Sequence, residues 1–303
     1  ESQSREHNDN KNKLILYLHR DILLPMPTNI KKNPEELYKI SNKLRLTVID
    51  MLTEAKTGHT AGSLGTAEIF SALYFHILKI DPKNPNKKDR DRFVLSNGHI
   101  CPIWYATLSE RGYFPKTELW KLRKINSKLQ GHPKMNSLPG IENTSGSLGQ
   151  GLSQAIGIAL AGKMNKVSYR VYCMTGDGEL NEGQIWESAM FAPNKKLDNL
   201  TWIIDRNHIQ SDGNTEDIMP LENLRDKLES FNWYVLAING NNVEEIISAC
   251  KIAESIKQRP TAIIANTIPG EGVDFIENKY EWHGKVPNKK EAEEAKEKLS
   301  SII

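Results

Sequence analysis

The sequence predicts an α/β fold in which helices flank both faces of a doubly wound, mostly parallel β-sheet. Short apolar runs typical of buried strands alternate with longer segments of helical periodicity. The clearest strand–helix–strand unit covers 169–213, where strands at 171–174 and 200–204 flank a helix that ends near Pro193. A crossover of this length makes its two strands parallel, with adjacent carboxyl ends. Open α/β sheets bind ligands at that edge, so we expect the functional site there.

The N-terminal part of the chain supplies an extension and two helices. Residues 1–33 are polar and rich in Asn and Lys, and we expect a partly disordered extension with no assigned role. A helix over 33–56 follows, because Asn suits its N-cap and Pro its first helical position. A glycine-rich loop is expected over 57–65, and a second helix over 67–79.

The alternation of strands and helices continues to the end of the chain. A strand at 93–95 leads into a helix that stops at Gly112, and the loop 146–151 opens a helix of small residues. The tail 287–303 is rich in Lys, Glu and Ala, which predicts a solvated helix after a single domain over 34–286. Between these, the pattern predicts a helix at 221–230, a strand at 234–238, a helix at 243–257 and a strand at 261–265.

Composition limits the class of function. The 40 Lys and Arg residues nearly balance the 38 Asp and Glu residues, which argues against nucleic-acid binding driven by bulk charge. Three cysteines without metal-like spacing do not form an even disulfide set, so we expect a reducing compartment and a cytoplasmic location. No apolar run reaches the ~18 residues of a membrane span, so no membrane association is expected.

Polar residues follow both strands of the central unit. Asp177 lies in a Gly-Asp-Gly turn after the first strand, and Asn207 follows the second strand. Adjacent strand ends would place the two side chains together. Carboxylate and amide oxygens are hard ligands that suit Mg²⁺ or Ca²⁺. The backbone amides of the helix expected after Gly178 would face a phosphate on the same ion, so the sequence predicts a metal–diphosphate site.

Histidine next to glycine recurs in the predicted loops. Each instance alone fits a flexible turn with a surface histidine, whereas the repetition favours a shared functional role. Neutral imidazole titrates in the range that is useful for proton transfer. The four instances are His59, His99, His132 and His283.

Taken in order, several segments resemble the N-terminal, diphosphate-binding half of transketolase over residues 34–286. They are GHTAGSLG, RDRFVLSNGH, GHP, GSLGQG, GDGELNEGQIWE, DRN and WHGK. The resemblance implies the thiamine-diphosphate-binding fold, with thiamine diphosphate and Mg²⁺ or Ca²⁺ as cofactors. It also implies transfer of a two-carbon ketol unit from a ketose to an aldose, with sugar phosphates as substrates.

The resemblance also bears on partners. The sequence ends where the pyrimidine-binding half of a full transketolase would begin, so the chain resembles either the N-terminal subunit of a split transketolase or a fragment of a longer one. A split enzyme implies a partner chain that carries the C-terminal, pyrimidine-binding half, in a hetero-oligomer built on a dimer. The isolated chain is then expected to bind cofactor weakly and to turn nothing over.

By position, the resemblance assigns the metal ligands to Asp177, Asn207 and the backbone carbonyl of Ile209, and it places Gly178 at the diphosphate. Two further residues, Gly146 and Leu148, would lie against the pyrimidine and thiazolium region.

Two kinds of role remain to be assigned by the resemblance. Glu182 would join an acidic network between paired active sites and so belong to the cofactor-binding residues. The catalytic residues would be the four histidines of the donor-sugar channel, which touch the diphosphate or the ketose: His59, His99, His132 and His283. Three of them, His59, His99 and His283, would also bind cofactor.

One position departs from the family pattern, and two other functions stay open. Asn266 stands where full-length transketolases carry a lysine, which removes a positive charge near the diphosphate. His208, between the metal ligands, is expected to face outward.

Two alternatives to a transketolase subunit stay open. One is the equivalent half of a 2-oxo-acid dehydrogenase α chain or deoxyxylulose-phosphate synthase, and the other is a non-catalytic regulatory homologue. The histidine-rich channel favours a polyhydroxylated ketose over pyruvate, and the intact metal motif argues against a non-catalytic role.

Overall fold

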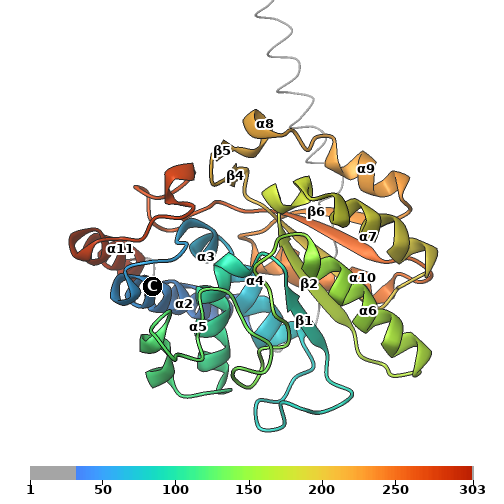
Figure 1. The fold of residues 1–303 in the computed structure, drawn as a ribbon, viewed down its shortest axis with the longest axis horizontal. Coiled ribbons are helices and arrows are strands. Elements are labelled where there is room, and N and C mark those ends of the chain that lie inside the picture. Colours follow the sequence, from blue (N-terminus) through green and yellow to red (C-terminus); the bar gives the residue numbers. More distant parts are fainter. Residues whose placement is uncertain (1–31, 302–303) are drawn as a thin grey trace, which may run out of the picture.

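A five-stranded parallel sheet occupies the centre of the computed structural model, which describes residues 32–301 (Figure 1). All neighbouring strands pair in parallel, in the order β1-β2-β3-β7-β6. The structure therefore confirms the predicted α/β class and the five predicted strands. These are β1 (Arg92–Leu95), β2 (Val171–Gly176), β3 (Leu200–Arg206), β6 (Tyr234–Asn239) and β7 (Thr261–Asn266).

Side chains of the central strands alternate between two separate apolar cores, one on each face of the sheet. Along β2, Tyr172 and Met174 are buried in one core, and Val171 and Cys173 are buried in the other. Both faces are covered, which explains why the strands appear in the sequence as continuous apolar runs.

Helices cover both faces, as a doubly wound sheet requires. In Figure 1, α6 and α7 lie on one side of the sheet, and α2, α4 and α5 lie on the other. The first face carries α6 (Gln150–Met164), α7 (Gly183–Asn194) and α9 (Leu224–Ser230). The second face carries α2 (Pro34–Ala55), α4 (Ala67–Ala72), α5 (Cys101–Arg111) and α10 (Val243–Ser255).

The first and last described helices pack together. Helix α2 begins where predicted, and the Asn33 side chain accepts a hydrogen bond from the Glu36 N–H at 2.8 Å. The helix expected from Lys289 is present as α11 (Lys289–Ser301). The expectation that it is solvated is wrong on one face, because three of its side chains are buried in the same core as α2: Ala292, Ala295 and Leu299.

Part of the segment predicted as a glycine-rich loop is a short helix, α3 (Ala61–Gly65). Its glycines serve close packing, since a Cβ added to Gly65 would lie 2.6 Å from the Ile268 carbonyl oxygen. The helix predicted over 67–79 changes register after α4 into a π-helical turn, η1 (Leu73–Ile77), in which the Leu78 N–H donates to the Leu73 carbonyl.

Several small elements lie in the loops between the main helices and strands and were not predicted. They are a two-stranded ribbon of β4 (Ile209–Gln210) and β5 (Gly213–Asn214), the single turn α8 (Thr215–Ile218), and 3-10 turns η2 (Gly98–Ile100), η3 (Lys116–Lys121), η4 (Gly178–Asn181) and η5 (Tyr280–Trp282).

Apart from Lys32 and Asn33, the predicted extension over 1–33 lies outside the described residues. Across residues 32–301, the structure contains no helix with the length and apolar character needed to cross a membrane.

Candidate active site

A cavity of about 350 Å³ opens at the carboxyl ends of β2 and β3. Its wall comes from loops that are far apart in the sequence and meet at this edge of the sheet. The residues lining it include ten that the sequence singled out: His59, His99, His132, Gly146, Leu148, Asp177, Gly178, Asn207, Ile209 and His283.

The carboxylate of Asp177 touches the segment that follows β3. The strands pair in register with Gly176 opposite Asp205, so their ends are neighbours. One carboxylate oxygen of Asp177 accepts the His208 N–H at 2.7 Å, which places it beside the segment between Asn207 and Ile209. The predicted meeting of the two strand ends is therefore confirmed.

The amide of Asn207 is fixed by two hydrogen bonds. Its Nδ2 donates to the Asp205 carboxylate at 2.9 Å, and its Oδ1 accepts the Ile209 N–H at 3.0 Å. Asp177, Asn207 and Ile209 are all buried, and all three face the cavity. A carboxylate, an amide oxygen and a backbone carbonyl form the kind of hard donor set that Mg²⁺ and Ca²⁺ prefer. The His208 side chain is exposed, as predicted.

Burial lowers the pKa of the histidines in the cavity. The rings of His59, His99 and His283 form a triangle with centroid separations of 4.9 to 5.7 Å. Desolvation lowers the pKa of His59 to about 4, with the His283 and Arg123 charges adding to the effect. Desolvation also lowers the pKa of His99, of His283 and of the more exposed His132. The triangle is therefore neutral at physiological pH.

The turn after β2 differs from the sequence expectation. The expected α-helix after Gly178 begins only at Gly183, because the 3-10 turn η4 intervenes. The Asp177 side chain caps that turn and accepts the Gly178 N–H at 2.8 Å. The prediction of an α-helix directly after Gly178 is therefore wrong, although Gly178 itself lines the cavity.

Glu179 is a buried carboxyl in the cavity wall that the sequence analysis missed. It accepts hydrogen bonds from the Ser96 hydroxyl, from the Gly149 N–H at 2.8 Å and from the Gly176 N–H at 3.1 Å. Burial raises its pKa to about 7, and these hydrogen bonds oppose the rise. Its sequence signal was only an acid within GDGEL, which is equally typical of an exposed turn.

Two buried charged or polar side chains beside Asp177 and the histidines were also missed. The fully buried guanidinium of Arg206 pairs with Asp177 at 2.8 Å and with Glu216 at 2.6 Å, which fixes the Asp177 carboxylate. Asn97 is fully buried at the cavity wall, and neither polar atom of its side chain has a partner among the described residues. A buried amide without a partner fits a wall that receives a polar ligand.

Two residues that the sequence analysis singled out, Glu182 and Asn266, do not line the cavity. Glu182 is exposed at the N-cap of α7 and is absent from the cavity wall. Asn266 ends β7, and its amide donates to the Ile238 carbonyl at 3.2 Å, also away from the cavity wall.

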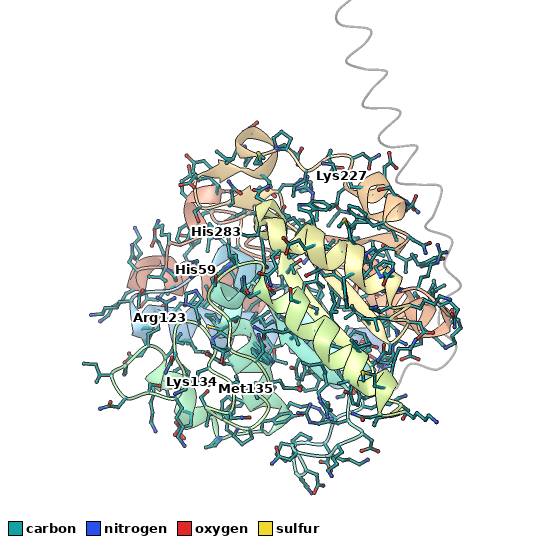
Figure 2. The ribbon with its side chains drawn as sticks, turned by 45° about the vertical axis from the view of Figure 1, so that its right-hand side comes forward. His59, Arg123, Lys134, Met135, Lys227 and His283 are labelled. Carbon is teal, nitrogen blue, oxygen red and sulfur yellow. The ribbon has the colours of Figure 1, made fainter. Side chains whose placement is uncertain are left out.

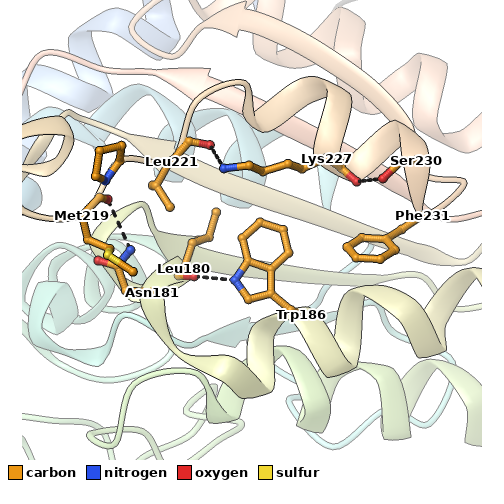
Figure 3. A pocket seen from close by; sticks show the side chains of 9 residues that line it. Leu180, Asn181, Trp186, Met219, Leu221, Lys227, Ser230 and Phe231 are labelled. Atoms are coloured by element: carbon orange, nitrogen blue, oxygen red, sulfur yellow. Dashed lines mark hydrogen bonds between the residues drawn. The ribbon is translucent and has the colours of Figure 1, made fainter.

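A second hollow, of about 370 Å³, is mainly apolar and contains no predicted site residue (Figure 3). The Trp186 and Phe231 rings lie along it, 6.2 Å apart. Its one charged side chain, Lys227, donates to the Leu221 carbonyl. Apart from Lys227, the residues that line this hollow carry no titratable side chain, so the histidine cavity is the candidate active site.

Comparison with known proteins agrees with this geometry. The chain is 44% identical over 248 residues to the 6-deoxy-6-sulfo-D-fructose transketolase subunit SqwG of Clostridium sp. (strain MSTE9), covering 82% of this chain and 90% of that protein. It is 40% identical to one of the subunits of the apulose-4-phosphate transketolase of Phocaeicola vulgatus, covering 89% of this chain and 95% of that protein.

A solved structure extends the comparison. The transketolase from Campylobacter jejuni superposes with a TM-score of 0.84 at 34% identity, over 89% of this chain but only 43% of that one. The family model described as "Transketolase, thiamine diphosphate binding domain" matches residues 37–301. The chain therefore belongs to the transketolase family and contains its thiamine diphosphate-binding domain.

Proposed function

We propose that the chain is the diphosphate-binding subunit of a transketolase, which transfers a two-carbon ketol unit from a ketose phosphate to an aldose phosphate. The observation that carries the proposal is a cavity in which a hard-oxygen donor set faces neutral histidines. A polyhydroxylated sugar needs many hydrogen-bonding groups, and this wall supplies them.

The cavity wall fits the cofactor. Asp177, Asn207 and the Ile209 carbonyl would hold Mg²⁺ or Ca²⁺, and the ion would fix the diphosphate beside Gly178. The loop that contains Gly146 and Leu148 would face the rings. When bound, thiamine diphosphate supplies the thiazolium carbon that stabilises the carbanion left by C2–C3 cleavage.

The histidines would handle the protons of the sugar. With a pKa of about 4, His59 stays neutral at physiological pH, so it serves better as an N–H donor to a sugar oxygen than as a proton store. Its Nδ1 is buried without a partner among the described residues, which leaves that atom for a ligand. The His99 and His283 rings lie 5.0 and 5.7 Å from the His59 ring and can share the hydroxyl groups of the same substrate.

We further propose a partner chain that carries the pyrimidine-binding half. The supporting observation is coverage, because the chain spans 90–95% of two relatives named as subunits and 43% of the Campylobacter transketolase. Glu182, exposed beside the cavity loops, would then act across the contact with that partner, in a hetero-oligomer built on a dimer. Three free, buried cysteines, Cys101, Cys173 and Cys250, support a cytoplasmic location.

Replacing Asp177 tests the proposal. Calorimetry with thiamine diphosphate and Mg²⁺, in the presence of the partner chain, should give affinity at least about tenfold weaker for D177A, because a charged ligand to the ion is lost. The exposed Asp217, which pairs with Asn214, offers the matched control D217N, whose affinity should be unchanged. Equal cofactor affinity in D177A and the wild type would refute the assignment.

A further inference from the structure

A cavity of about 440 Å³ lies near the amino ends of β1 and β2, away from the candidate active site. Its wall comes from the π-helical turn η1, the loop that leads into β1, the last residue of α5, and Ser168 shortly before β2. Among the described residues, none lines both this cavity and the histidine cavity. In Figure 1 the loop that leads into β1 lies at the bottom of the view, and in Figure 2 it lies below the labelled His59 and His283. The two cavities are therefore at opposite edges of the sheet.

The π-helical turn releases a backbone carbonyl that holds one cation of this wall. In an α-helix the Leu78 N–H would donate to the Tyr74 carbonyl, but here it donates to the Leu73 carbonyl at 2.8 Å. The Tyr74 carbonyl accepts the Arg111 Nε at 3.0 Å instead. The Arg111 guanidinium also lies over the Phe75 ring, 5.7 Å from its centroid. The change of register therefore fixes Arg111 in the cavity wall.

A buried carboxylate fixes the backbone that carries the second cation, Lys79. Asp91 lies directly before β1 and is 2% exposed. Its side chain accepts the Lys79 N–H at 2.8 Å and the Arg170 N–H at 2.9 Å, and its own N–H donates to the Lys79 carbonyl at 3.1 Å. The backbone of Lys79 is therefore tied to the start of the sheet.

The charges of Arg111 and Lys79 are not neutralised within residues 32–301. In that part of the chain neither side chain forms an ion pair, and the Arg111 Nη atoms and the Lys79 Nζ have no hydrogen-bond partner. The other charged groups of the wall are already engaged: Arg90 with Glu142 at 2.6 Å, Lys87 with Asp89 at 3.3 Å, and Asp81 with the Lys83 N–H at 2.9 Å. The cavity therefore offers two fixed, unpaired cations.

We propose that this cavity binds a small phosphate monoester that carries a ring, such as a nucleoside monophosphate. Arg111 supplies a planar fork of N–H donors and Lys79 a point charge, which together match a phosphate dianion. The volume falls in the range of about 300–1,000 Å³ that is typical of small-molecule sites, so there is room for more than the phosphate. The apolar part of the wall, which includes Phe75 and Ile80, would contact the ring. This inference does not rest on the proposed function.

The test measures binding of AMP by calorimetry to the chain with its partner, saturated with thiamine diphosphate and Mg²⁺. Adenosine is the uncharged counterpart of AMP, and inorganic phosphate is the anion without a ring. We expect AMP to bind at least about tenfold more tightly than either. R111Q should weaken AMP binding at least about tenfold, because two charge-assisted donors are lost, and K79Q should weaken it less. R111K, which keeps the charge without the fork, should keep part of the affinity.

K83Q is the matched control, because it makes the same charge change at an exposed residue of the same loop outside the cavity wall. Its affinity for AMP should equal that of the wild type. The site is refuted if AMP binds no more tightly than adenosine or inorganic phosphate, or if R111Q and K79Q bind AMP as the wild type does. Loss of AMP binding in D177A would place AMP in the histidine cavity and would also refute the site. None of these outcomes bears on cofactor binding by the wild type, so the proposed function is tested separately. Circular dichroism and thermal unfolding check that each variant is folded.

Discussion

At the scale of single residues, the site depends on side chains whose burial sets their charge. His59, His99 and His283 lie in a partly desolvated cluster that disfavours imidazolium, so they present neutral donors and acceptors to a ligand. On the opposite side of the cavity, the buried guanidinium of Arg206 pairs with the Asp177 carboxylate at 2.8 Å and fixes its position. The cavity therefore has carboxyl and amide oxygens on one side and neutral imidazole rings on the other.

The lowered pKa of His59 predicts how stability depends on pH. An unfolded histidine takes up its proton near pH 6.5, whereas folded His59 does so only near pH 4. Between these values the unfolded state binds more protons, so the free energy of unfolding should fall as the pH falls from 6.5 to 4. H59Q should show a shallower fall, measured by urea unfolding at a series of pH values. A slope as steep as that of the wild type would contradict the assigned pKa shift.

At the scale of elements, local patterns predicted the strands and the meeting of Asp177 with the segment after β3. Each strand follows from its own apolar run, and the meeting follows from signals within one strand–helix–strand unit. Glu179 was not predicted as a site residue, because its environment comes from a distant segment. Glu179 meets Ser96 from 83 positions away. A single sequence does not indicate which distant segments come into contact, so it does not distinguish this buried carboxyl from a solvated one.

The glycine-rich segment was predicted as a loop, whereas part of it forms the helix α3, in which glycine allows close packing. This packing role predicts how a substitution at Gly65 changes stability. Gly65 touches the Ile268 backbone, which cannot move aside as a flexible side chain could. G65A should therefore lower the free energy of unfolding by about 1–3 kcal/mol, the usual cost of overpacking.

The matched control for G65A lies in α6. Gly157 is exposed, and an added Cβ there would meet nothing within 4 Å. G157A should raise the free energy of unfolding by about 0.5–1 kcal/mol through helix propensity. Urea unfolding of both variants measures the difference, and equal stability of G65A and the wild type would refute the packing role of Gly65.

At the scale of the whole molecule, the proposed partner chain would complete the active site, and the surface beside the cavity suggests where that chain binds. Helix α7 leaves Met190 and Phe191 exposed at 57% and 43%, close in sequence to the exposed Glu182 at its start. Exposed large apolar side chains on one helix are typical of protein–protein contacts. We therefore expect the pyrimidine-binding partner to cover the face that carries α7.

This expectation predicts both an activity and a contact. The isolated chain should show no ketol transfer, because the residues that activate the cofactor ring are expected on the partner, and adding the partner should restore transfer. F191S should weaken association with the partner at least about tenfold, as truncating a buried aromatic anchor does. I125S alters a side chain that is 94% exposed on the connection after η3, which packs with α2 and α5 on the opposite face, and should leave association unchanged. Steady-state assays measure ketol transfer, and sedimentation measures the association of the chain with its partner. Ketol transfer by the isolated chain would show that it needs no partner, and unchanged association of F191S would place the contact on another face.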